Sequence, residues 1–424
     1  MKSLPALLLS AFSFSALSLT TDLGKLQFGG YLENKATVNI SPNEIISDVA
    51  QTRIEGYWDF GKYGGIESHV ILTAPLQPLD PFETLREGSV TDVLFKQLLS
   101  PYMEALGEFQ SSAELLPVSE TTINRLIKYL PYSTFYPSDK VILDRALVKA
   151  YFKYFDLFIG RQMIAWGTGY AFNPTDVWNS KSPLDPDAPK VGVTALRLEI
   201  PLGSLSRISI VASPGRNIDN SSGGIRYKTH IAGFDFSFSG IRLMNADRQI
   251  LGLPAKMIYG ADLAGQIGEV GVWAEVALNN PIYSGMEYTD FDSCYLQADI
   301  GVDYTFTNGL YAMAEYYFNQ SGKKKATDYI TVDLINVLVG DMSGLARHYL
   351  FAGLRYAAVD RFTFSAFTLS NLVDHSVMLI PSVEYSLSDN ISLELGAQIG
   401  VGDKEKSEYG GVTPNIYLKT TGYF

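Results

Sequence analysis

The sequence has few of the residues that build disulfide scaffolds and metal sites. Its 424 residues include one cysteine, Cys294, so no disulfide can form within the chain. The four histidines, His69, His230, His348 and His375, lie far apart, and neither an HExxH nor a CxxC spacing occurs. We therefore expect no metal site and no cofactor.

Long apolar runs are also scarce. One run, Leu4 to Leu17, follows Lys2 and ends in Ala16-Leu17-Ser18, a small-x-small pattern typical of a secretory signal peptide. The run is shorter than the roughly 20 apolar residues that a membrane-spanning helix needs, and no later uncharged segment reaches that length. The sequence thus predicts a signal peptide at residues 1–18 and a mature protein at 19–424, and it argues against a helical membrane protein.

Positive charge is the scarcer sign. The chain has 33 lysines and arginines against 45 aspartates and glutamates, which gives a formal net charge of −12. A nucleic-acid-binding protein favours a basic surface, so no nucleic-acid partner is expected. No Gly-x-Ser-x-Gly elbow occurs, and neither His69 nor His230 has a recognisable serine partner, so the chain is not expected to be an enzyme.

What the sequence does contain is repeated two-residue alternation. Between Val141 and Tyr154, apolar side chains occupy every second position and basic ones lie between them. Strand periodicity places the two sets on opposite faces, of which the apolar one suits lipid and the basic one suits water. The apolar set is Ala146, Val148, Ala150 and Phe152, and the basic set is Arg145, Lys149 and Lys153.

Eighteen such segments follow one another, and their connections alternate in length. Tight turns such as Gly203-Ser204 and Asn308-Gly309 are followed by longer loops, which is typical of a membrane barrel. An even strand count places both chain ends on the periplasmic side, and the 26 tyrosines and 23 phenylalanines suit aromatic girdles. The predicted fold class is therefore all-β, a transmembrane antiparallel β-barrel of about 18 strands.

One loop breaks this pattern. In residues 75–139, apolar positions recur at helical spacing, from Val90 to Leu98 and from Ile123 to Leu130. These stripes predict a helical insert in one extracellular loop, because exposed apolar stripes would need something to pack against. The insert is expected either to cap or plug the barrel mouth or to form a separate surface module.

Three short motifs lie close together: Gly160-Arg161-Gln162, Trp166-Gly167 and Asn173-Pro174-Thr175-Asp176. A similar series occurs in porin-like and polysaccharide-export barrel families, and the mature chain resembles a bacterial outer-membrane porin. The resemblance implies a channel in the bacterial cell outer membrane, surrounded by outer-membrane lipid and open to small hydrophilic solutes. The last strand, ending in Phe424, resembles the signal read by the barrel-assembly machinery. Substrate and oligomeric state, including a homo-oligomer, stay open.

Charged residues at the alternate strand positions that should face the barrel interior fall into two groups along the chain. Closure of the barrel would place the groups on different arcs of a water-filled wall, where their field would set ion preference. The predicted basic channel-lining residues are Arg145, Lys149, Lys153, Arg197, Arg207, Arg226 and Lys228. The predicted acidic ones are Asp262, Glu275, Asp299, Asp303 and Glu315.

The composition of residues 166–190 predicts an ordered loop that narrows the channel, with Asp176 and Asp185 meeting arginines of the lumen. Arg161 occupies one of the alternate positions of its strand that are otherwise apolar and should face lipid. Either a bulge at Gly160 returns it to the lumen as an anchor, or it lies at the level of the lipid headgroups. The predicted constriction residues are Arg161, Asp176, Trp178 and Asp185.

Two functions are compatible with these features. The first is a channel for passive or facilitated passage of small hydrophilic solutes or ions. The alternative is a surface-exposed structural or adhesin-like barrel, in which the inward charges pair with one another and the lumen is closed.

Overall fold

The computed structural model describes the chain in separate stretches, which together contain one antiparallel sheet of nineteen strands. The described residues are 17–21, 24–40, 45–77, 141–178, 183–184, 190, 192–244, 248, 254–282, 294–329, 333, 337 and 342–424. The strands are β1 (Leu17–Thr21), β2 (Gly24–Asn39), β3 (Ile45–Asp59), β4 (Gly64–Gln77), β5 (Val141–Tyr151), β6 (Asp156–Gln162), β7 (Val193–Pro201), β8 (Ser206–Ser213), β9 (Ser222–Ile231), β10 (Phe234–Leu243), β11 (Ala255–Ile267), β12 (Val270–Ile282), β13 (Tyr295–Thr305), β14 (Leu310–Asn319), β15 (His348–Val359), β16 (Phe362–Asn371), β17 (Ser376–Ser388), β18 (Ile391–Val401) and β19 (Asn415–Tyr423).

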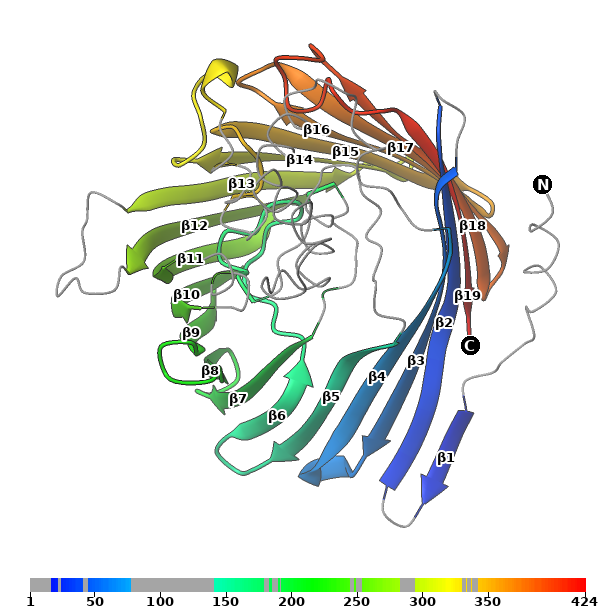
Figure 1. The fold of residues 1–424 in the computed structure, drawn as a ribbon. Helices are drawn as coiled ribbons and strands as arrows, with labels where there is room; N and C mark the ends of the chain where they lie inside the picture. Colours follow the sequence, from blue (N-terminus) through cyan, green and yellow to red (C-terminus); the bar gives the residue numbers. More distant parts are fainter. Residues whose placement is uncertain are drawn as a thin grey trace, which may run out of the picture.

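Eighteen of these strands close into a barrel, which Figure 1 shows from one end. Each strand from β2 to β19 pairs with its neighbours in sequence, and β19 returns to pair with β2, for example Leu418 with Ala36. The predicted antiparallel barrel of eighteen strands is therefore confirmed. The extra strand, β1, pairs with the first residues of β2, where β19 does not reach. It straddles the predicted signal-peptide boundary, which stays a prediction.

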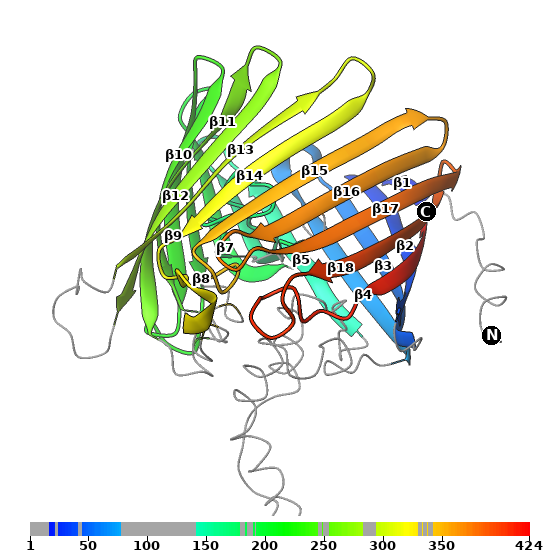
Figure 2. The same cartoon turned by 90° about the horizontal axis from the view of Figure 1, so that it is seen from above.

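Connections at one end of the barrel are all short. Eight turns of two to four residues join β3 to β4, β5 to β6 and so on to β17 and β18, whereas the connection from β4 to β5 at the other end has 63 residues. Figure 2 shows the hairpins gathered at one end. Gly203 and Gly309 have φ angles of +80° and +85° in two of these turns, a conformation that glycine adopts without steric strain.

Side-chain alternation in the wall follows the sequence pattern. Val148, Ile159 and Leu196 lie side by side across β5, β6 and β7, and each is between 44% and 49% exposed on the outer face. Their chain neighbours Leu147 and Ala195 are buried on the inner face. The two faces therefore differ in burial, and the outer one exposes a row of apolar side chains, as a membrane barrel requires.

Three of the four residues expected to face lipid lie in β5 and follow this pattern: Val148 is exposed, and Ala146 and Ala150 are partly exposed. The fourth, Phe152, is exposed but lies in the turn after β5, where the alternation has ended.

One irregularity in the wall alters the set of inward residues. The pairing of β4 with β5 shifts register between His69 and Val70, opposite Asp144. Such a bulge adds one residue to a strand and allows two consecutive side chains to share a face. Both Asp144 and Arg145 consequently reach inward, where Asp144 meets Arg53 and Arg145 meets Glu67.

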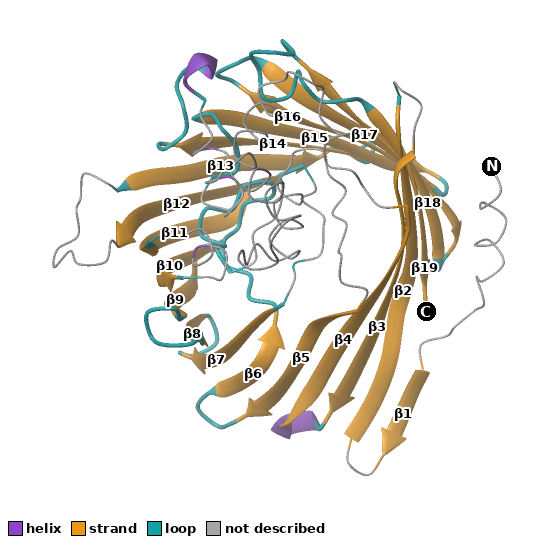
Figure 3. Ribbon diagram, in the orientation of Figure 1, coloured by secondary structure: helices purple, strands orange, loops and turns teal. Residues whose placement is uncertain are grey.

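From residue 78 onward, the predicted helical insert lies outside the described residues, so its helices and its role as a cap, plug or surface module stay predictions. The helical elements with described bounds are two short 3-10 turns, η1 (Gly61–Tyr63) and η3 (Ala326–Asp328), coloured purple in Figure 3. Within the described stretches, no helix has the length and apolar character needed to cross a membrane.

Candidate functional site in the barrel interior

The connection between β6 and β7 lies inside the barrel (Figure 1). Residues 163–178 of this connection are held there by two apolar clusters. Ile164 and Trp166 are buried against residues of β7 to β12, such as Ile258. Phe172 stacks on Tyr317 of β14, with ring centroids 4.4 Å apart and planes 6° from parallel. Burial of these large rings stabilises the loop against the inner wall.

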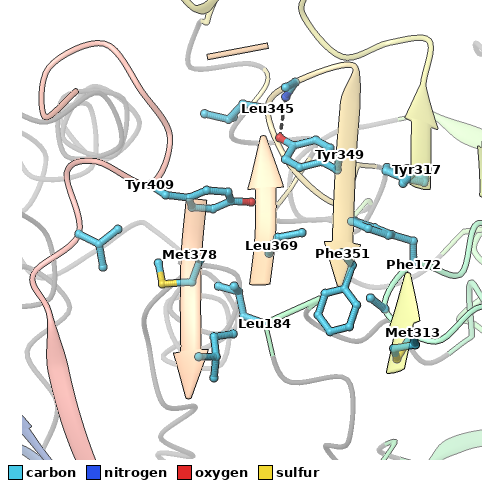
Figure 4. Packing of buried hydrophobic residues seen from close by; sticks show 14 of the residues in the cluster. Phe172, Leu184, Met313, Tyr317, Leu345, Tyr349, Phe351, Leu369, Met378 and Tyr409 are labelled. Carbon is cyan, nitrogen blue, oxygen red and sulfur yellow. Dashed lines mark hydrogen bonds between the residues drawn. The ribbon is translucent and has the colours of Figure 1, made fainter. Parts of the chain in front are cut away.

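The apolar contacts extend well beyond this loop, as Figure 4 shows. The same buried cluster includes residues of β14 to β17 and of the loop between β18 and β19, among them Met313, Tyr349, Phe351, Leu369, Met378 and Tyr409. These side chains face the interior, so the expectation that inward positions meet water is wrong for this arc. The reason is that loops fold inward and cover the wall with apolar side chains of their own.

Glu315 on β14 holds the loop through its backbone. Its carboxylate accepts the N–H groups of Tyr170, Ala171 and Phe172 at 2.7, 3.1 and 2.7 Å. It also accepts the indole N–H of Trp273 at 2.7 Å. Glu315 is completely buried by this arrangement. Four donors converging on one carboxylate make charge-assisted hydrogen bonds, which are stronger than neutral ones.

Glu275 on β12 does the same for the neighbouring part of the loop. Its carboxylate accepts the backbone N–H groups of Thr168, Gly169 and Thr175, with distances of 2.6 Å for Gly169 and 3.2 Å for Thr175. The hydroxyl of Thr175 donates a further bond at 2.8 Å. Gly167 allows the close approach, because its φ of +93° and the space beside Glu275 both exclude a side chain.

The acidic residues form a row across three strands. Asp262, Glu275 and Asp299 lie directly opposite one another on β11, β12 and β13. Like charges in such positions repel, so each needs its own compensation. Arg226 of β9 supplies it for Asp262, at 3.0 Å. Asp299 is buried, and neither of its oxygens has a hydrogen-bond partner among the described residues.

This arrangement corrects two features of the predicted acidic arc. Glu275 and Glu315 point inward, but the loop covers their carboxylates and uses them as anchors. Arg226 was assigned to the basic group, yet it contacts the acidic row directly, so the two groups meet at β9 to β11. Asp303 remains partly exposed and accepts the hydroxyl of Tyr311 at 3.0 Å.

The predicted constriction residues are placed differently from one another. Trp178 is buried against Trp166, with ring centroids 5.7 Å apart, and Asp176 forms an ion pair with Lys190. Asp185 lies outside the described residues. The pairing through Gly160 shows no register shift, so the bulge predicted there is not present. The strand pairing instead places Arg161 beside Ala146 and Thr194, among the residues of the outward face.

The opposite wall, from β3 to β5, carries a network of paired charges. Arg53 is buried and its guanidinium reaches Asp144 at 2.9 Å and Glu55 at 2.6 Å. It also donates to Nδ1 of His69 at 2.7 Å. Strand alternation gives no sign that Asp144 joins this network, because that contact depends on the bulge in β5.

Basic side chains along β5 to β9 are partly accessible. Lys149 pairs with Glu67 at 2.7 Å, Arg145 approaches the same Glu67 at 3.6 Å, and Arg197 lies over the ring of Phe158 at 4.2 Å. Arg207 and Lys228 are direct cross-strand neighbours.

Lys153 differs from the other predicted basic residues. It lies in the turn after β5, beside Tyr154, and is not part of the wall. The alternation was extrapolated past the end of the strand, and this assignment was wrong.

The chain has no match among protein-family models, and no curated protein sequence matches it. Solved structures of similar fold do exist. OccK11 (OpdR) of Pseudomonas aeruginosa has a TM-score of 0.55 at 9% identity, over 94% of this chain and 96% of that one. OccAB2 of Acinetobacter baumannii has a TM-score of 0.54 at 7% identity, over 94% and 98%. The outer membrane protein OpdK of Pseudomonas aeruginosa has a TM-score of 0.53 at 6% identity, over 94% and 98%. At such identities the similarity establishes the fold, a closed barrel matched along nearly its whole length.

Proposed function

We propose that the chain is a channel of the bacterial outer membrane that passes small hydrophilic solutes or ions. The observation that carries this proposal is the closed barrel of eighteen strands with exposed apolar rows outside and charged residues inside. Barrels of about 16–18 strands enclose an aqueous lumen, whereas smaller ones are filled by side chains. The similar outer membrane protein OpdK supports the same location.

The passage we propose runs along the wall of β3 to β9. Residues 168–175 of the inner loop occupy the side of the interior next to β11 to β15, through their bonds to Glu275 and Glu315, whereas Ile164 and Trp166 pack on the wall of β7 to β12. Lys149, Arg197 and Lys228 of the other wall keep between 24% and 29% of their side-chain surface exposed. Charges that line a narrow pore set its ion preference, so these residues are proposed to favour anions.

Ion conductance in a planar lipid bilayer tests the proposal. Purified protein should produce stepwise current increases, and the reversal potential in a salt gradient should indicate anion preference. A folded, membrane-inserted barrel without conductance would contradict the channel and would favour the structural or adhesin-like barrel with a closed lumen.

Two finer predictions accompany this function. Phe424 exchanges backbone hydrogen bonds with Gly30 at 3.0 Å in both directions, which supports a role for this residue in closing the barrel. Recognition of the last strand by the barrel-assembly machinery stays a prediction. Deleting Phe424 should reduce the amount of heat-modifiable barrel in the outer membrane. The resemblance of the Gly-Arg-Gln motif to polysaccharide-export barrels and the formation of a homo-oligomer stay predictions.

A further inference from the structure

One buried carboxylate joins several loops at the long-loop end of the barrel. Glu408 lies between β18 and β19 and is buried. Its Oε2 accepts the hydroxyl of Tyr349 at 2.6 Å and the side-chain amide of Asn371 at 2.7 Å. Its Oε1 accepts the backbone N–H of Leu345 at 3.2 Å. Figure 4 shows Tyr349 and Leu345 beside Tyr409, the chain neighbour of Glu408.

A second carboxylate faces the same group. Asp374, in the connection between β16 and β17, accepts the backbone N–H of Glu408 at 2.8 Å and the hydroxyl of Tyr329 at 3.0 Å. It also accepts the hydroxyl of Ser376 at 2.6 Å. These bonds hold Asp374 close to Glu408, where one negative charge opposes a second.

The bonds donated to Glu408 favour its ionised form, but burial and the nearby Asp374 outweigh them and favour the neutral form. Burial, followed by repulsion from Asp374, raises the pKa of Glu408 to about 7. Among the described residues, the tyrosine hydroxyls of Tyr329 and Tyr349 also face it. Burial raises the pKa of Tyr329, so this hydroxyl stays neutral where Glu408 titrates. The two short bonds from Tyr349 and Asn371 both end on Oε2, which remains an acceptor when Oε1 carries the proton.

We propose that Glu408 is a pH-responsive latch. Its protonated carboxyl joins the β14–β15, β16–β17 and β18–β19 loops, and its ionised form lets them separate. The separation itself requires only the loops, whereas any effect on conductance rests on the proposed channel.

The direction of the pH dependence follows from linkage. The joined loops bind the proton more tightly than separated loops, in which Glu408 returns to its ordinary pKa of 4.5. The joined state is therefore fully stabilised below pH 4.5 and loses stability as the pH rises toward 7. The ratio of separated to joined loops should rise by up to about tenfold per pH unit and about 300-fold in total, and should level off above about pH 7.

Hydrogen exchange of the intact protein in detergent micelles tests the latch. Protection of residues 402–414, corrected for the pH dependence of intrinsic exchange, should fall between pH 4.5 and 7 in the wild type. The substitution Glu408→Gln keeps a neutral side chain at every pH, so protection should become independent of pH. Glu405→Gln, an exposed position of the same loop, should retain the wild-type behaviour.

A second variant shifts the latch without removing it. Tyr349→Phe deletes the hydroxyl bond that favours the ionised carboxylate, so the midpoint of the protection change should move to higher pH. Wild-type protection that does not change with pH, or a Glu408→Gln protein with the wild-type pH dependence, would overturn the proposal. If the loops respond as expected but no current flows at any pH, the channel proposal fails and the latch stands.

Discussion

The two sides of the barrel interior compensate buried charge in different ways. On β3 to β5, side chains pair with one another, as Arg53 does with Asp144 at 2.9 Å and Lys149 with Glu67 at 2.7 Å. On β12 and β14, Glu275 and Glu315 pair with backbone N–H groups of the loop inside the barrel. A lysine can leave its partner by a rotamer change, whereas a backbone donor leaves only if the loop moves. One side therefore keeps adaptable charges, and the other has a rigid lining.

The largest effect is expected from removing the principal loop anchor. Glu315→Ala would leave four donors, including the indole of Trp273, without their acceptor, at about 1–3 kcal/mol for each donor that stays buried. Residues 168–175 should detach from β14, so single-channel conductance should increase and the loop should become sensitive to protease. Glu199→Ala on the opposite wall is the control, because Glu199 contacts Ser209 and Arg197 and no loop residue in the described contacts. Unchanged protease resistance in the Glu315→Ala protein would refute the anchoring role.

A smaller effect is expected from removing one donor of the second anchor. Thr175→Val deletes the hydroxyl that donates to Glu275 at 2.8 Å and keeps the side-chain shape. Because three backbone N–H groups still reach the carboxylate, the loop should stay in place while the free energy of unfolding falls by about 1–2 kcal/mol. Denaturant unfolding in micelles measures this change. Thr194→Val, at an exposed position of β7, should change it by less than about 0.5 kcal/mol, and equal losses in the two variants would contradict the comparison.

The smallest effect on stability, together with a clear effect on ion selectivity, is expected on the wall of β3 to β5, where the charged side chains are adaptable. Lys149→Gln removes a partly exposed partner of Glu67, and such pairs contribute at most about 1 kcal/mol. The reversal potential in a salt gradient should shift toward cation preference, because a positive charge leaves the wall and Glu67 is uncovered. Lys153→Gln, in the turn after β5, should leave the reversal potential as it is. A shift of the same size in both variants would show that bulk surface charge, rather than the wall, sets the preference.

The strands were predictable because a wall with lipid outside imposes period-two alternation on every segment. Val148, Ile159 and Leu196 illustrate this, since each is apolar, each lies between inward neighbours, and all three align across the sheet. The tight turns were also encoded locally, by glycines such as Gly309 that adopt a positive φ. Counting alternate positions gave the wrong face for Asp144, because a bulge intervenes there. It also misplaced Lys153, because the strand had already ended.

The interior could not be predicted in the same way. The alternation of residues assigned Glu275 and Glu315 to the face of the lumen. It contained no information that the loop beginning after Gln162 would cover them. Their donors are about a hundred or more residues away in sequence, at separations of 106 for Gly169 and 145 for Tyr170. Only a burial pattern within the loop, such as its cluster of Trp166, Phe172 and Trp178, could have indicated an inner packing surface.

By itself, the sequence determined the number of strands, their antiparallel order and the face that meets lipid, because these depend on short-range periodicity and on turns of a few residues. The tertiary structure decided which inward charges are exposed, which serve as anchors and which, like Glu408, lie at a junction of loops. These outcomes depend on contacts between strands and loops that only closure of the barrel brings together. The burial of a carboxylate, and hence its role, is a property of that assembled interior.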